Sequence, residues 1–187
     1  MPALAADLDT FHIDSPLGTL AASASGRGLR SLRFLSNDPL APVPPVDGAP
    51  GADLCDPERP CAGPHLELLR RQIADYLAGS SAPFTVPLDP LGTPFQLGVW
   101  NALRTIPHGQ TRSYADVARA IDRPDAVRAV AAANGDNPIA ILIPCHRVIG
   151  SDGSLTGYAG GLWRKARLLK LEAHARRSSP EPSPPPT

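Results

Sequence analysis

The sequence predicts two domains, a small α/β domain followed by a mainly helical domain that contains a helix-turn-helix. Three observations favour this fold class. Short segments with alternating apolar residues occupy the first 34 positions of the 187-residue chain. A stretch rich in Pro, Gly, Ala and Asp follows them, and most of the second half shows helical spacing of its apolar residues. A chain of this length is enough for one or two small domains with a real core.

We place the first domain at residues 1–86, with a long exposed loop at 36–64, and the second domain at 87–177. The tail, residues 178–187, is rich in Ser and Pro, a composition that predicts disorder. The turn Ser15-Pro16-Leu17-Gly18 separates the first two strands. In order, the three strands and one helix of the first domain are predicted at 9–14, 18–23, 28–34 and 64–77.

The second domain is predicted to be mostly helical. Thr93-Pro94 caps its first helix, and Ser113 to Asp116 form a capping-box-like start of the second. The second and third helices are joined tightly through Asp122-Arg123-Pro124, which is the signature of a helix-turn-helix. An apolar run at 139–143 predicts a buried strand, which with a return through Gly150–Gly153 would make the motif winged. The predicted helices cover 94–106, 113–121, 124–134 and 163–173.

Charge is divided between the two halves although the net charge of the chain is zero. Residues 1–94 hold six basic and eleven acidic side chains, a net charge of −5, whereas residues 95–177 hold twelve basic and six acidic ones, a net charge of +6. Basic clustering on one domain is typical of a protein that binds a polyanion. The alternative is a solvated face whose charge is incidental.

Several classes of protein are disfavoured by composition. No apolar run is long enough to span a bilayer, so we expect no membrane segment. The N-terminus lacks the basic and apolar regions of a secretion signal. Three cysteines, an odd number, do not form a disulfide framework. We therefore expect a reducing compartment, the cytoplasm, and the Ala-, Pro- and Arg-rich composition indicates a GC-rich bacterium.

The run Pro144-Cys145-His146-Arg147 is the strongest chemical signal in the chain. A buried cysteine in an apolar stretch is commonly an inert core residue. Here Pro144 interrupts the predicted strand, so that Cys145 can leave it and face a pocket. His146 supplies a nearby base and Arg147 a nearby positive charge, and both are expected to lower the thiol pKa. The pattern favours a nucleophilic cysteine.

At this point the chain resembles the O6-alkylguanine-DNA alkyltransferase (methylated-DNA–protein-cysteine methyltransferase) family, continuously from Thr93 to Glu172. The resemblance implies an RNase H-like first domain packed on a winged-helix second domain. Two departures are visible, Ala131 where the family usually has glycine and an unusually long, Pro-rich 36–64 loop. The matching motifs are Thr93-Pro94-Phe95-Gln96, Val99-Trp100, Ile106-Pro107-His108-Gly109-Gln110-Thr111, Ser113-Tyr114, Ala126-Val127-Arg128-Ala129-Val130, Asn134-Gly135, Asn137-Pro138, Pro144-Cys145-His146-Arg147-Val148-Ile149-Gly150 and Leu155-Thr156-Gly157-Tyr158-Ala159-Gly160-Gly161-Leu162.

The resemblance implies direct reversal of DNA damage, in which the alkyl group of O6-alkylguanine, and of O4-alkylthymine, moves irreversibly to Cys145 in a single turnover. His146 would take the thiol proton through a water, Glu172 would orient His146, and Asn137 would tie the recognition helix to the active-site segment. The residues themselves place Glu172 on the apolar face of the last helix, where a carboxylate needs a partner. Asn137 also fits a simple Asn-Pro turn.

The target base lies inside the duplex, so the resemblance further implies base flipping from the minor groove of double-stranded DNA. Tyr114 would rotate the target phosphate and Arg128 would fill the vacated stack, although a core tyrosine and a surface arginine are the ordinary alternatives. Small residues of the recognition helix would approach the groove, and three residues would line the substrate pocket. These residues are Ala129 and Ala131 on the helix, and Val148, Tyr158 and Ala159 at the pocket.

We expect no metal and no cofactor, because Cys55, Cys61 and His65 give too few ligands in a loose loop. The expected partner is duplex DNA carrying O6-alkylguanine, bound by a monomer, with cooperative binding left open. Two other functions compete. A non-enzymatic damage sensor of the same fold would lack the reactive cysteine, and a cysteine hydrolase would need an oxyanion-hole motif that the sequence does not show.

Overall fold

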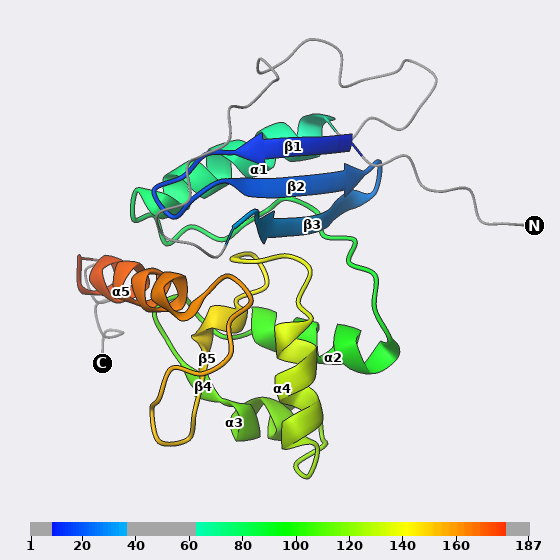
Figure 1. The fold of residues 1–187 in the computed structure, drawn as a ribbon, viewed down its shortest axis with the longest axis vertical. Helices are drawn as coiled ribbons and strands as arrows, with labels where there is room; N and C mark the ends of the chain where they lie inside the picture. Colours follow the sequence, from blue (N-terminus) through cyan, green and yellow to red (C-terminus); the bar gives the residue numbers. More distant parts are fainter. Residues whose placement is uncertain (1–8, 37–62, 179–187) are drawn as a thin grey trace, which may run out of the picture.

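The computed structural model describes residues 9–36 and 63–178. Three antiparallel strands, β1 (Asp9–Ile13), β2 (Leu20–Ser25) and β3 (Gly28–Phe34), form a sheet in that order. Helix α1 (Gly63–Leu77) lies along one face of this sheet (Figure 1). Its apolar residues recur at helical spacing and face the sheet, so that burial of one stripe fixes the helix in place.

The second domain is built on helices α2 (Pro94–Arg104), α3 (Tyr114–Ala120) and α4 (Val127–Gly135), with α5 (Leu162–Ser178) beside the first domain (Figure 1). Capping boxes at Thr93 and Ser113 start α2 and α3, as the sequence predicts. Two short strands, β4 (Arg112–Ser113) and β5 (Val148–Ile149), pair in parallel. The α/β domain followed by a helix-turn-helix domain confirms the predicted fold class.

Two predicted elements are wrong in detail. The third helix begins at Val127, not at residue 124, because Pro124 and Asp125 form a turn that is closed by a hydrogen bond from the Ala126 N–H to the Arg123 carbonyl. Residues 139–143 form turns and not a strand. Ile141 has a left-handed φ of 71°, and Ile143 N–H donates to the carbonyl of Ile139 within the segment. The apolar run therefore indicates that the segment is buried, but not that it forms a strand.

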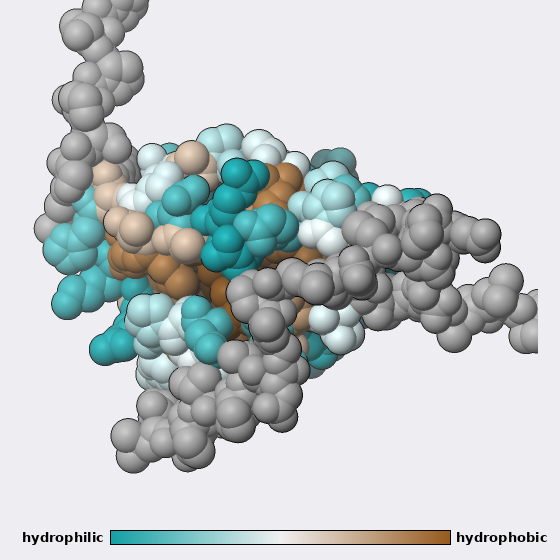
Figure 2. All heavy atoms as spheres, turned by 90° about the horizontal axis from the view of Figure 1, so that it is seen from above, coloured by the Kyte–Doolittle hydropathy of each residue, from teal (hydrophilic) through white to brown (hydrophobic). Residues whose placement is uncertain are grey.

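The two domains meet at this irregular segment. Leu32 of β3 donates its N–H to the carbonyl of Pro138, and its carbonyl accepts from the N–H of Ala140. These two hydrogen bonds form an isolated parallel β-bridge that joins the two domains. Leu32 and Ile139 are fully buried there. On the face seen in Figure 2, hydrophilic residues border a central band of hydrophobic residues.

Candidate active site

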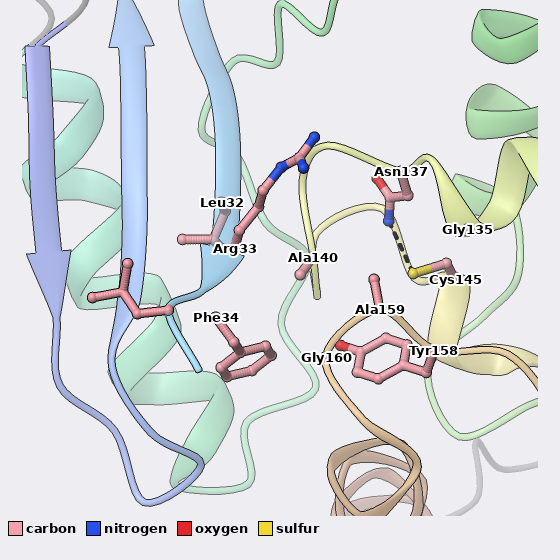
Figure 3. Close-up of a pocket in the computed structure, with 11 residues that line it drawn as sticks. Leu32, Arg33, Phe34, Gly135, Asn137, Ala140, Cys145, Tyr158, Ala159 and Gly160 are labelled. Carbon is pink, nitrogen blue, oxygen red and sulfur yellow. Dashed lines mark hydrogen bonds between the residues drawn. The ribbon is translucent and has the colours of Figure 1, made fainter. Parts of the chain in front are cut away.

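Cys145 begins the 3-10 turn η1 (Cys145–Arg147), directly after Pro144, and lies outside any strand, as the interruption by Pro144 predicts. Its side chain is 6% exposed and lines a pocket of about 220 Å³ between the two domains (Figure 3). The amide of Asn137 fixes this turn. Its Nδ2 donates to the Ile143 carbonyl (2.7 Å) and to Cys145 Sγ (3.0 Å), while its Oδ1 accepts from the N–H of Ile139 (3.0 Å).

The thiol of Cys145 is not acidic in this resting arrangement. Burial raises its pKa, and the hydrogen bond from Asn137 and the positive charge of Lys165 offset this only in part. The expectation that Arg147 lowers the thiol pKa is wrong, because its guanidinium is held by Glu172. Lys165, which the sequence analysis did not single out, is the cation that acts on the sulfur. A base is therefore needed to make the thiolate.

His146 is placed to serve as that base. Its ring is fully buried, and Nε2 lies 2.9 Å from Oε1 of Glu172. Burial lowers the pKa of His146, so the ring is neutral near pH 7 despite the opposing pull of Glu172. A neutral ring that donates from Nε2 to a carboxylate carries its lone pair on Nδ1. Nδ1 is buried without a protein partner and is free to accept a proton.

Glu172 holds several elements together below the histidine. Burial alone would raise its pKa, but hydrogen bonds from His146 and Arg147 outweigh this and keep the pKa well below its usual range. Arg147 contacts both carboxylate oxygens, at 2.8 and 2.9 Å. The Tyr76 hydroxyl (2.7 Å) and the Gly109 N–H (2.9 Å) also donate to it. Sequence reasoning found Glu172 but missed Tyr76 and Gly109, because nothing in their local patterns points to a site.

The predicted pocket residues divide into two kinds. Tyr158 and Ala159 line the pocket, and the buried Tyr158 hydroxyl has no protein partner. Val148 is fully buried and does not line the pocket; its carbonyl accepts from Lys165 Nζ (2.6 Å). Lys165 also donates to the carbonyl of Thr156 and so ties the segment carrying Tyr158 to β5.

Arg164 fixes the other end of the pocket segment. Its guanidinium lies between the rings of Phe34 (4.3 Å) and Trp163 (4.4 Å). It donates to the carbonyl of Leu17 in the first domain and to that of Gly160 in the pocket wall (2.7 Å). One buried cation therefore joins the β1–β2 turn, the end of β3 and the pocket segment.

Replacing Arg164 with leucine is expected to destabilise the fold by about 2–4 kcal/mol, because two buried carbonyls lose their donor. Arg164→Lys should restore the charge but only part of the stability, since lysine lacks the planar fork that stacks and donates in two directions. Urea unfolding of both variants measures this. If Arg164→Leu unfolds at the wild-type midpoint, the guanidinium does not join the domains.

The predicted DNA-contacting residues lie outside the pocket, on the helix-turn-helix. Arg128, Ala129 and Ala131 are exposed on α4. Tyr114 is half-buried at the start of α3, and its hydroxyl lies 3.3 Å from the Thr156 carbonyl. The structure thus brings Cys145, Asn137, Tyr158 and Ala159 to one pocket, puts His146 and Glu172 behind it, and leaves the α4 residues on the surface.

Within residues 9–36 and 63–178, no cluster of three or more His, Cys, Asp or Glu is arranged to hold a metal ion. Cys55 and Cys61, considered as ligands from sequence, lie outside that part of the chain. None of the helices described is long and apolar enough to cross a membrane.

Comparisons with known proteins match both domains. Residues 11–90 match the family model of the 6-O-methylguanine DNA methyltransferase ribonuclease-like domain, and residues 94–174 match that of its DNA binding domain. A methylated-DNA–protein-cysteine methyltransferase of Methanosarcina barkeri is 44% identical over 88% of this chain and 97% of its own. One from Mycobacterium tuberculosis is 45% identical over 86% and 89%. The crystal structure of the M. tuberculosis OGT in complex with DNA superimposes with a TM-score of 0.71, at 43% identity, over 88% of this chain and 92% of that one.

Proposed function

Since the chain belongs to the methylated-DNA–protein-cysteine methyltransferase family, we propose that it repairs O6-alkylguanine in double-stranded DNA by moving the alkyl group to Cys145. DNA repair by alkyl transfer to a cysteine is the activity of the family. The observation that carries the assignment to Cys145 is the pocket itself. Its sulfur faces the cavity beside Tyr158 and Ala159, with Asn137 donating to it.

The chemistry follows from the geometry. His146 Nδ1 takes the thiol proton through a water, and Glu172 stabilises the imidazolium that forms. The thiolate attacks the alkyl carbon, the S–C bond forms, and the C–O6 bond breaks in one displacement. The departing guanine is stabilised by hydrogen bonds at O6 and N3, a role that suits the Tyr158 hydroxyl and the Ala159 N–H, and it takes up one proton in place of the one that the thiol lost. A thioether has no easy hydrolytic exit, so each molecule acts once.

Access to the base requires flipping, because O6 lies within the stack and the sulfur lies in a pocket. We assign Tyr114 to rotation of the target phosphate and Arg128 to the space that the base leaves. The exposed, small side chains of Ala129 and Ala131 permit close approach to the minor groove. We further propose that the protein acts as a monomer in a bacterial cytoplasm and that O4-alkylthymine is a second substrate. Asn137 holds the recognition helix and the active-site turn in position relative to each other.

The test of the proposed function is the mass of the intact protein after incubation with an O6-methylguanine duplex, followed by peptide mapping. We expect one methyl group per molecule, on Cys145. Tight, alkyl-dependent binding without an adduct would instead assign the chain to the non-enzymatic damage sensors.

Replacing Arg128 with alanine is expected to slow repair of duplex DNA by roughly 10- to 100-fold, because filling the stack repays part of the few kcal/mol that unstacking costs. The reaction with free O6-methylguanine, which needs no flipping, should slow much less. Rates on both substrates are compared with those of Lys170→Ala, which removes an exposed charge from α5. Equal losses on both substrates would contradict a role in flipping.

A further inference from the structure

The first domain supplies one wall of the active-site pocket. Strand β3 and the residue after it contribute Leu32, Arg33, Phe34 and Leu35, opposite the wall that carries Cys145 (Figure 3). The two walls pack closely at one end, where a Cβ on Gly160 would lie 2.8 Å from the ring of Phe34. An alkyl group that extends across the pocket from Cys145 therefore approaches β3.

Arg33 is the one charged residue of this lining. Its side chain is exposed, and it makes no hydrogen bond or ion pair with the residues described in the structure. Figure 3 shows the side chain extending from β3 toward the segment that carries Asn137 and Ala140. By contrast, Arg27 and Arg30 on the same hairpin are both paired with Asp89. Of the three arginines of this hairpin, only the one at the pocket is left without an anionic partner among the described residues.

The displacement reaction determines where a longer alkyl group lies. Sulfur, the attacked carbon and O6 must be nearly in line, so a substituent on that carbon projects sideways from the line. Tyr158, Ala159 and Gly160 occupy the side of the pocket that belongs to the second domain. The wall that faces them is formed by β3, where Arg33 stands, and Gly135, Asn137 and Ala140 complete the lining.

We propose that Arg33 makes this protein selective for O6-alkyl groups that carry a carboxylate, of which carboxymethyl is the smallest. This rests on the proposed function. The planar guanidinium donates to both carboxylate oxygens, a contact that no neutral alkyl group offers. Cys145 thiolate attacks the methylene carbon, the S–C bond forms, and the C–O6 bond breaks. The products are S-carboxymethylcysteine and guanine, which takes up one proton.

A DNA phosphate offers Arg33 the same oxygen geometry, so the test uses free nucleobases that contain no phosphate. O6-carboxymethylguanine and O6-carbamoylmethylguanine differ only in a carboxylate against a neutral amide. Transfer rates to Cys145 are measured by intact mass for the wild type, Arg33→Leu, Arg33→Lys and the matched control Arg71→Leu, an exposed arginine of α1. The readout is the rate ratio of the two substrates, in which their different intrinsic reactivities cancel between variants.

We expect Arg33→Leu to lower the carboxymethyl-to-carbamoylmethyl ratio by about tenfold, the value of one partly desolvated charge-assisted contact. Arg33→Lys should keep part of the ratio, and Arg71→Leu all of it. An unchanged ratio in Arg33→Leu overturns the proposal, whether absolute rates stay or fall together. Transfer of methyl from O6-methylguanine is run in parallel. Its absence in the wild type would overturn the proposed function, and the selectivity with it.

Discussion

Replacing Cys145 with serine is expected to abolish alkyl transfer, with a loss of at least roughly a thousandfold. A serine hydroxyl has a far higher pKa than a thiol, and its oxygen is a weak nucleophile toward an alkyl carbon. A neutral His146 is too weak a base to deprotonate a serine hydroxyl to a useful extent. The substitution spares the fold, because a hydroxyl accepts the Asn137 hydrogen bond as the sulfur does.

Two measurements separate chemistry from binding in this variant. Intact mass after incubation with an O6-methylguanine duplex reports transfer, and fluorescence anisotropy with the same duplex reports binding. Cys61→Ser, which removes a thiol elsewhere in the chain, is the matched control and should transfer normally. Methylation of the Cys145→Ser protein at the wild-type rate would show that another residue is the acceptor.

If Cys145 is the acceptor, as proposed, its surroundings keep it unreactive before substrate binds. Burial raises the pKa of Cys145 and lowers that of His146, so that the neutral forms of both groups are favoured. In the proposed mechanism, the flipped base brings an electrophilic carbon beside the sulfur. A buried thiol that stays protonated is protected from adventitious oxidants, because these attack the thiolate.

Local signals explain which parts of the fold could be predicted from sequence. A few adjacent residues are enough to specify the capping boxes at Thr93 and Ser113 and the turn from Ser15 to Gly18. The 139–143 segment contains no comparable local signal for its conformation. Its apolar residues are buried by β3 from the other domain, and Ile141 adopts a left-handed conformation that no propensity indicates. A strand was therefore the wrong reading of a buried irregular segment.

The same distinction applies to the site. Cys145 and His146 are adjacent, and Glu172 stands out as a carboxylate on an apolar helix face, so all three could be found from sequence. Tyr76 and Gly109 reach Glu172 across 96 and 63 positions of chain. Such contacts depend on the tertiary packing of elements that are far apart in the chain. Nothing in the sequence singles out Lys165 or Arg164, because their burial depends on the tertiary packing around α5.

Replacing Glu172 with glutamine is expected to cost both stability and activity. Arg147 would be left buried without a counterion, which costs about 3–5 kcal/mol when one partner of a buried pair is removed. The imidazolium of His146 would lose the carboxylate that stabilises it, and we expect transfer to slow by on the order of 10²- to 10⁴-fold. Urea unfolding and intact mass, on the same preparation, measure the two losses. Asp75→Asn, which neutralises an exposed carboxylate on α1, is the matched control.

The loss of stability in Glu172→Gln should also depend on pH, and it should become smaller as the pH falls. The pKa of Glu172 is depressed in the folded protein, so its stabilisation is fully present above the unfolded value of about 4.3 and is lost as the pH falls toward the folded value. The gap in unfolding free energy between wild type and Glu172→Gln should therefore be constant near neutral pH and narrow below about pH 4. A gap that stays constant into acid would mean that Glu172 contributes through packing and neutral hydrogen bonds, and that Arg147 is not held by its charge.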